Sequence, residues 1–176
     1  MILHIRLRSL PIALALLLGG LLPANAVADD PLPPEARADK VIVLKKEHVL
    51  KLLRGHHVLK TYKIALGGDP VGPKQQEGDH RTPEGTYILD RRNPRSRFYR
   101  SLHISYPNAE DQRRAAAKGI SPGGDIMIHG LPNGFGWLGA AHRVRDWTDG
   151  CVAVTDAEMD EIWRAVPDGT PIEIRP

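Results

Sequence analysis

The chain contains a single cysteine, Cys151, and a histidine, His129, that closes a short apolar run earlier in the sequence. A cysteine sulfur can attack an amide carbonyl when a neighbouring imidazole takes its proton and later returns it to the leaving group. An ordinary cysteine has a pKa of about 8.5, so the nucleophile needs such a partner. The two residues therefore predict acyl-transfer chemistry. A buried and unreactive thiol is the alternative, because free cysteine is among the most buried residue types.

Glycines stand next to both of these residues. Gly150 precedes Cys151, and Gly130 follows His129. Glycine adopts backbone angles that other residues avoid, and it lets backbone or substrate approach closely. We therefore expect the N–H groups of Gly150 and Cys151 to point at one oxyanion, since an acyl-transfer site needs donors for the charge that develops there.

The elements around the pair must bring it together. Residues 126–128 are apolar and predict a buried strand with His129 at its end. Residues 131–147 contain three glycines and a proline, which is typical of a long loop that returns to the sheet. The return of this loop would place Cys151 beside His129.

The rest of the chain predicts a mostly β domain with two short accessory helices. Asn108 is expected to cap a helix that ends at Lys118, and the capping-box pair Thr155 and Glu158 begins a second helix that runs to about Val166. Short β-branched or leucine-rich runs between turn residues predict strands. These runs cover residues 41–44, 49–53, 58–66, 86–89, 102–106 and 171–174.

The first residues are typical of a secretory signal peptide. A positively charged start is followed by an apolar run of about 13 residues and by the small-residue site Ala24-Asn25-Ala26. The run is shorter than the roughly 20 residues that span a bilayer, so we expect cleavage and no stable membrane span, with a retained anchor as the alternative. The expected organisation is a signal peptide over residues 1–26, an extended lead-in over 27–38 and one domain over 39–176.

The charge is small and locally concentrated. The formal net charge of +3 falls to +1 when Arg6 and Arg8 leave with the signal peptide, so no general nucleic-acid footprint is expected. Guanidinium groups bind carboxylates in pairs, and a cluster of them predicts either a site for an acidic ligand or a solvated face. The cluster consists of Arg91, Arg92, Arg95, Arg97 and Arg100.

Three segments together resemble the catalytic domain of the L,D-transpeptidase (YkuD-type) family. They are Ile128-His129-Gly130, Thr148-Asp149-Gly150-Cys151 and Thr82-Pro83-Glu84-Gly85-Thr86-Tyr87. The resemblance covers about residues 41–174 and implies a mixed β-sandwich or barrel fold. It also implies a periplasmic enzyme that needs no cofactor or metal.

The resemblance assigns a role to each residue of the motifs. Cys151 would attack the carbonyl of the third residue, usually diaminopimelate, of a peptidoglycan stem tetrapeptide, and His129 would transfer the proton. The resulting thioester passes to an amine, which gives a 3,3 cross-link when the amine belongs to another stem, and carbapenems would acylate the same sulfur. Gly150 would supply an oxyanion N–H, while Gly130, Thr148 and Asp149 would contact the substrate.

One position departs from the family. The arginine that is usual two residues after the cysteine is Ala153 here, so Arg143 and Arg145 are its expected substitutes. The departure keeps a second activity open, namely hydrolysis of a stem amide or of the amide between diaminopimelate and an attached envelope protein.

Two further alternatives do not require acyl transfer. A non-catalytic peptidoglycan-binding module would need only the fold and not a reactive thiol. A zinc site would draw on Cys151, His129, His142 and Asp149, but the chain has no closely spaced ligand pair such as C-x-x-C.

Overall fold

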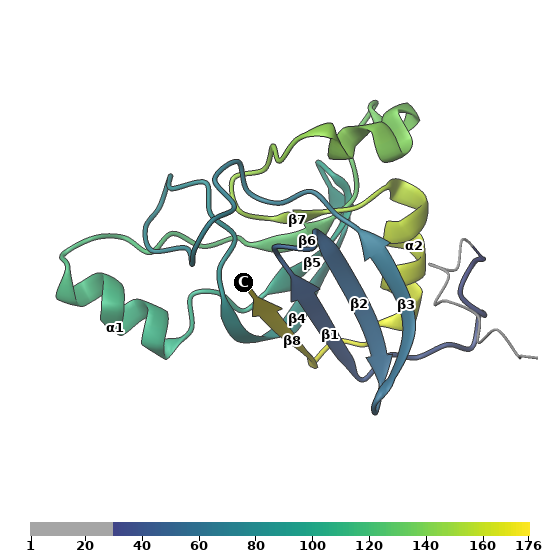
Figure 1. Ribbon diagram of the computed structural model, residues 1–176, viewed down its shortest axis with the longest axis horizontal. Helices are drawn as coiled ribbons and strands as arrows, with labels where there is room; N and C mark the ends of the chain where they lie inside the picture. The colour runs from purple at the N-terminus through teal and green to yellow at the C-terminus, as the bar shows by residue number, and fades with distance from the viewer. Residues whose placement is uncertain (1–29) are drawn as a thin grey trace, which may run out of the picture.

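A curved, eight-stranded sheet dominates the computed structural model, which describes residues 30–176 (Figure 1). The predicted mostly β class is therefore confirmed, while the predicted signal peptide lies outside the described residues. The strands are β1 (Lys40–Leu44), β2 (Val49–Arg54), β3 (His57–Lys63), β4 (Gly85–Ser96), β5 (Tyr99–Ile104), β6 (Met127–His129), β7 (Val152–Ala153) and β8 (Thr170–Arg175). The helices are α1 (Ala109–Ala117), α2 (Asp156–Ala165) and the 3-10 segment η1 (Gly136–Val144).

The sheet curls until its two ends meet. The strand order is β3-β2-β1-β8-β4-β5-β6-β7, with β1–β8 and β6–β7 parallel and the other pairs antiparallel. Ala65, just beyond β3, nevertheless pairs with Ala153 of β7 through two backbone hydrogen bonds of 2.9 and 3.0 Å. Joining the ends satisfies backbone groups that an open edge would leave unpaired. It also fixes the position of β7, directly after Cys151.

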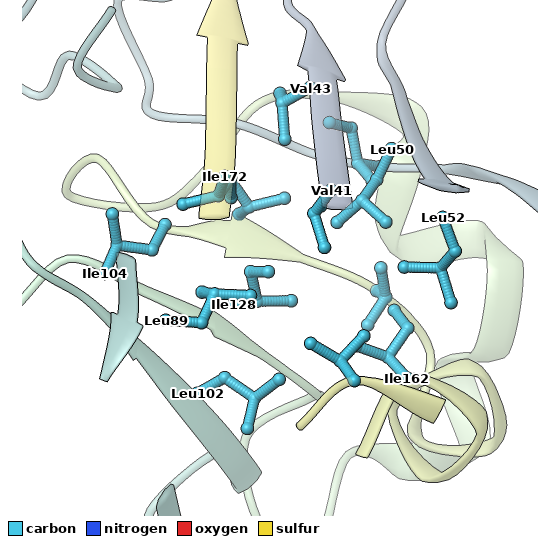
Figure 2. Packing of buried hydrophobic residues seen from close by; sticks show 14 of the residues in the cluster. Val41, Val43, Leu50, Leu52, Leu89, Leu102, Ile104, Ile128, Ile162 and Ile172 are labelled. Atoms are coloured by element: carbon cyan, nitrogen blue, oxygen red, sulfur yellow. The ribbon is translucent and has the colours of Figure 1, made fainter. Parts of the chain in front are cut away.

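The core fills the inside of this curl. In β1, buried residues alternate with partly exposed ones, as a sheet with one covered face requires. Figure 2 shows Val41 and Val43 of β1 in one cluster with Leu50 and Ile172 of the adjacent strands β2 and β8 and with Ile128 of β6, on the other side of the curl. Ile162 of α2 closes the same cluster, so this helix covers the core next to the end of β7.

Both predicted α-helices are present with their predicted caps. Asn108 accepts from the N–H groups of Glu110 and Asp111, and Thr155 forms a capping box with Glu158. Figure 1 shows α1 at one end of the molecule, away from α2. Within residues 30–176, no helix combines the length and apolar composition that crossing a bilayer requires.

The structure differs from the predicted elements in two places. β4 continues to Ser96 instead of ending at Leu89, because its polar second half pairs with β5 as a ribbon whose side chains are largely exposed. Such a ribbon lacks the apolar alternation that predicts a strand. The segment predicted as a plain loop over residues 131–147 contains η1, which is interrupted at Gly139.

Gly67 lies where the chain after β3 meets the loop before Cys151. A Cβ atom at this position would lie 2.2 Å from the backbone oxygen of His80 and 3.1 Å from the Cα atom of Gly150. The Gly67 N–H also donates to the Thr82 hydroxyl at 3.1 Å. Only a residue without a side chain allows the backbones to approach this closely.

We therefore expect Gly67→Ala to lower the free energy of unfolding by about 1–3 kcal/mol, the usual range for overpacking. Gly68→Ala is the matched control, because the nearest atoms to its added Cβ lie 4.0 Å away. Urea denaturation of both variants measures the difference. Equal losses in the two variants would contradict the close approach at Gly67.

Candidate active site

Neighbouring strands bring Cys151 and His129 to one face of the sheet. β6 and β7 run parallel, with His129 opposite Ala153 and Ile128 opposite Val152. Because alternate residues of a strand share a face, Cys151 lies on the same face as Ala153 and hence as His129. Both side chains line one pocket of about 550 Å³. The predicted return of the chain to the sheet after residue 131 is thus observed.

His129 is held as a neutral imidazole with one nitrogen available. The ring is buried, and its Nδ1 lies 2.6 Å from the carbonyl oxygen of Gly130. A carbonyl can only accept, so Nδ1 carries the proton and Nε2 of the neutral ring can accept another. Burial lowers the pKa of His129 to about 4, against a smaller raising effect of the Gly130 carbonyl. His129 can therefore act as a base at neutral pH.

Aromatic rings surround this imidazole. The Phe98 ring centroid lies 4.6 Å from that of His129, and the Trp147 centroid lies 5.8 Å away. Phe98 comes from the β4–β5 turn, and Trp147 comes from the loop that leads to Cys151. These contacts exclude water from the ring and so account for its burial and its lowered pKa.

The Cys151 thiol is protonated in this structure. Burial raises the pKa of the thiol to about 11; the N–H of Met127 lowers it, and the charges of Asp149 and Asp125 raise it further. Within the described residues the thiol donates to the Asp125 carbonyl at 3.6 Å and not to His129. The pair is therefore a neutral thiol and a neutral imidazole, and not a preformed ion pair.

The turn before the cysteine requires glycine. Gly150 has a φ of 122°, and a Cβ atom there would lie 2.5 Å from the carbonyl oxygen of Arg81. Thr148 holds the turn, because its hydroxyl donates to the Cys151 carbonyl at 2.8 Å and accepts from the Gly150 N–H at 3.1 Å. The Gly150 N–H, which is predicted to face an oxyanion, therefore donates to Thr148 in this structure.

Two other predicted contact residues have different surroundings. A Cβ atom on Gly130 would lie 2.6 Å from Asp156 Oδ1 and 3.0 Å from the Tyr99 Cβ, so this glycine permits packing beside α2. Asp149 is exposed at the pocket rim, where its carboxylate lies 2.8 Å from Nδ1 of His80. Of the two, Asp149 is the one that a ligand in the pocket can reach.

The predicted substitutes for the family arginine do not line this pocket. Arg143 forms an ion pair with Glu158 at the start of α2, and Arg145 lines a separate apolar pocket beside η1. Ala153 itself is fully buried in β7. The arginines that do line the Cys151 pocket are Arg95 and Arg97 of the β4–β5 hairpin. Both residues were identified from the sequence as members of the arginine cluster, but the sequence did not indicate that they line the pocket of Cys151.

Asp146 is a supporting residue that the sequence analysis missed. Its carboxylate accepts from the Leu66 N–H at 2.7 Å and lies 2.9 Å from Nε2 of His48. The contact ties the loop before Cys151 to the chain beyond β3. A single aspartate in a loop has no sequence signal for this role.

The four residues of the zinc alternative are not gathered at one point. His142 lines the apolar pocket beside η1 and accepts from the Trp147 indole N–H at 3.4 Å. Asp149 is paired with His80 instead. Across residues 30–176, no group of three His, Cys, Asp or Glu side chains is arranged to hold a metal ion.

Comparison with known families agrees with this geometry. Residues 38–174 match YkuD, the L,D-transpeptidase catalytic domain. The chain belongs to this family. Its fold, a curled and mostly β sheet, is that of solved L,D-transpeptidases such as the one from Xylanimonas cellulosilytica. That structure has 16% identity and a TM-score of 0.51, and the match covers 83% of this chain and 64% of that structure.

Two relatives are more similar in sequence. YafK of Escherichia coli K12, whose assignment as an L,D-transpeptidase is provisional, is 33% identical over 130 residues, which cover 70% of this chain and 45% of YafK. The helical cell shape determining protein Pgp2 from Campylobacter jejuni has 26% identity and a TM-score of 0.60, over 80% of this chain and 48% of that structure. The chain thus spans about half the length of these relatives.

The raised pKa of Cys151 predicts how its reactivity depends on pH. The thiolate is the reacting form, so the rate of alkylation by iodoacetamide should rise about tenfold per pH unit and level off only near pH 11. Cys151 is the only cysteine, so peptide mapping by mass spectrometry follows its alkylation separately from that of lysine amines, for which Cys151→Ala is the control. A rate that levels off below pH 9, with the fold intact by circular dichroism, would contradict the buried thiol.

The lowered pKa of His129 predicts a loss of stability in acid. Between its ordinary value of 6.5 and about 4, the unfolded chain binds more protons than the folded one, so the free energy of unfolding falls as the pH falls through this window. The contribution is about 3 kcal/mol. His129→Gln should flatten the dependence of the unfolding free energy on pH, whereas substitution of the exposed His56 by Gln should not. Part of the slope should remain in His129→Gln, because the pKa of His142 is lowered in the same direction. Identical profiles for His129→Gln and wild type would contradict the assignment.

Proposed function

We propose that this domain is a periplasmic peptidoglycan L,D-transpeptidase that works through a thioester on Cys151. The observation that carries the proposal is the single pocket lined by Cys151 and His129, in which Nε2 of His129 is left to accept a proton. The membership of the family supports the substrate class, because its chemistry is L,D-transpeptidation.

The first half-reaction forms the thioester. Rotation of the Cys151 side chain from the Asp125 carbonyl toward Nε2 of His129 lets the imidazole take the thiol proton as the sulfur attacks the third-residue carbonyl of the stem. The negative oxygen then needs donors, and we assign the Cys151 N–H to this role because the Gly150 N–H is bound by Thr148. When the amide bond breaks, His129 returns the proton to the departing D-alanine amine.

The second half-reaction releases the thioester. An acceptor amine attacks the thioester carbonyl while His129 takes one of its protons. The sulfur leaves and recovers that proton from His129, so the enzyme returns to its starting state. A neutral imidazole suits both steps, because it accepts a proton at neutral pH and its low pKa makes it a ready donor once protonated.

Hydrolysis is the second candidate, and one observation favours it. Ala153 replaces the arginine that is usual in the family, and its buried position in β7 leaves no charged side chain there. A changed pocket fits the use of water as acceptor, on a stem amide or on the amide to an attached envelope protein. The similarity to Pgp2, a cell shape determining protein, supports action on peptidoglycan in either case.

Product analysis separates these activities. Purified tetrapeptide muropeptides are incubated with the domain and with Cys151→Ala, and the products are identified by mass spectrometry. We expect 3,3-linked dimers with the wild type and at least a 10³-fold slower reaction with Cys151→Ala, because the variant has no nucleophile at the position of the Cys151 sulfur.

The other outcomes are equally informative. Shortened tripeptides without dimers, again only with Cys151 intact, would favour the hydrolase. Unchanged muropeptides with folded wild-type protein would move the test to peptidoglycan with attached protein. Equal turnover by Cys151→Ala would contradict both activities.

A further inference from the structure

The pocket that holds Cys151 and His129 has a basic side that the proton transfer does not use. Arg95 and Arg97 line the pocket from the end of the β4–β5 hairpin. Both side chains are exposed. A guanidinium fork binds carboxylates through two parallel hydrogen bonds, so the two residues offer donors to an anionic ligand.

Arg95 and Arg97 combine two properties, because they line the pocket and have no acidic partner among the described residues. Among residues 30–176, no carboxylate lies within ion-pair distance of Arg95 or Arg97. Three nearby arginines are engaged by acidic partners, and Arg91 and Arg145, which have no ion pair among the described residues, do not line this pocket. The engaged pairs are Arg92 with Asp168, Arg100 with Asp160 and Arg143 with Glu158.

The end of the hairpin is held firmly beside the reacting groups. Arg97 and Phe98 lie between the last residue of β4 and the first of β5, and the Phe98 ring packs on His129. Asn133 fixes this turn from outside, since its N–H donates to the Arg97 carbonyl at 3.0 Å and its side-chain amide donates to the Ser96 carbonyl at 3.1 Å. The Arg97 backbone is therefore positioned relative to the catalytic imidazole.

Acidic and basic residues line different parts of the pocket. Asp125 and Asp149 line the pocket near Cys151, while Arg95 and Arg97 line it from the hairpin. A carboxylate is repelled by the aspartates and attracted by the arginines. Ala153, which lies where the family usually has an arginine, is fully buried and offers no charge to a ligand.

We infer that Arg95 and Arg97 bind a free carboxylate of the stem peptide and thereby orient its scissile amide toward Cys151. This inference deepens the proposed function and rests on it for the identity of the ligand. The two arginines act by positioning the substrate, and they take no part in proton transfer. The two carboxylates on the residues that flank the scissile amide can fill the role: the C-terminal one and the one on the side chain of the third residue.

Binding measurements test the inference without requiring turnover. A Cys151→Ala background is titrated calorimetrically with the stem tetrapeptide, and Arg95→Ala and Arg97→Ala are added in turn. We expect each to weaken binding by about tenfold or more, the usual loss for a hydrogen bond to a charged group. Arg91→Ala is the matched control, because it removes the same charge from β4 without lining the pocket, and its effect should stay within about twofold.

Two modified ligands identify the carboxylate. One tetrapeptide has its C-terminus amidated, and the other has the side-chain carboxylate of the third residue amidated. Amidation of the carboxylate that the arginines bind should weaken binding about as much as an arginine substitution does. Combining that amidated ligand with an arginine variant should cause no further loss of affinity, since both changes remove the same contact.

The outcomes separate this inference from the proposed reaction. Arginine-dependent binding with no turnover by the wild type would overturn the reaction and support the carboxylate site. Equal binding by the parent and both arginine variants, or no detectable binding by the folded parent, would overturn the carboxylate site even if turnover is found. The arginine substitutions could also weaken binding of a ligand with both carboxylates amidated as much as they weaken binding of the unmodified tetrapeptide. That result would overturn the carboxylate site as well.

Discussion

The pairing of Ala65 with Ala153 is the constraint on which the rest of the structure depends. It joins the two ends of the curled sheet and fixes β7 beside β6, so that Cys151 comes to the face that carries His129. The chain must then pass very close to itself, and the glycines Gly67 and Gly150 make this possible. Each allows a backbone approach that any side chain would block. Cys151 is thus positioned by backbone pairing and not by its own packing.

The same closure explains the electrostatics of the candidate site. Burial keeps both Cys151 and His129 neutral, which raises the pKa of the thiol and lowers that of the imidazole. A protonated thiol is a poor target for oxidants, because oxidation and disulfide exchange proceed through the thiolate. In the proposed periplasmic location, which is oxidising, protonation of the thiol would protect Cys151. In the proposed mechanism, activation therefore comes with the substrate, when the thiol proton passes to His129 at the moment of attack.

Local signals predicted much of this fold, and contacts between distant segments set the remainder. The caps at Asn108 and Thr155 were correct because a cap is formed by residues within one turn. The full length of β4 was missed, since its polar half is stabilised by pairing with β5 and not by burial. Arg143 was wrong as a pocket residue because Glu158, a partner from another element, holds it. The hydrogen bond from the Gly150 N–H to Thr148 was not predicted, because the orientation of the Thr148 hydroxyl has no sequence signature.

The central claim is that Cys151 carries the acyl group, and trapping the intermediate tests it most directly. Wild-type protein is mixed with a disaccharide tetrapeptide, quenched in acid within seconds and measured by intact-protein mass spectrometry, followed by peptide mapping. We predict a mass increase equal to the mass of the disaccharide tetrapeptide minus that of D-alanine, located on the peptide that contains Cys151 and removed by hydroxylamine. Turnover without any such adduct on Cys151 at any quench time, or an adduct on another residue, would contradict it.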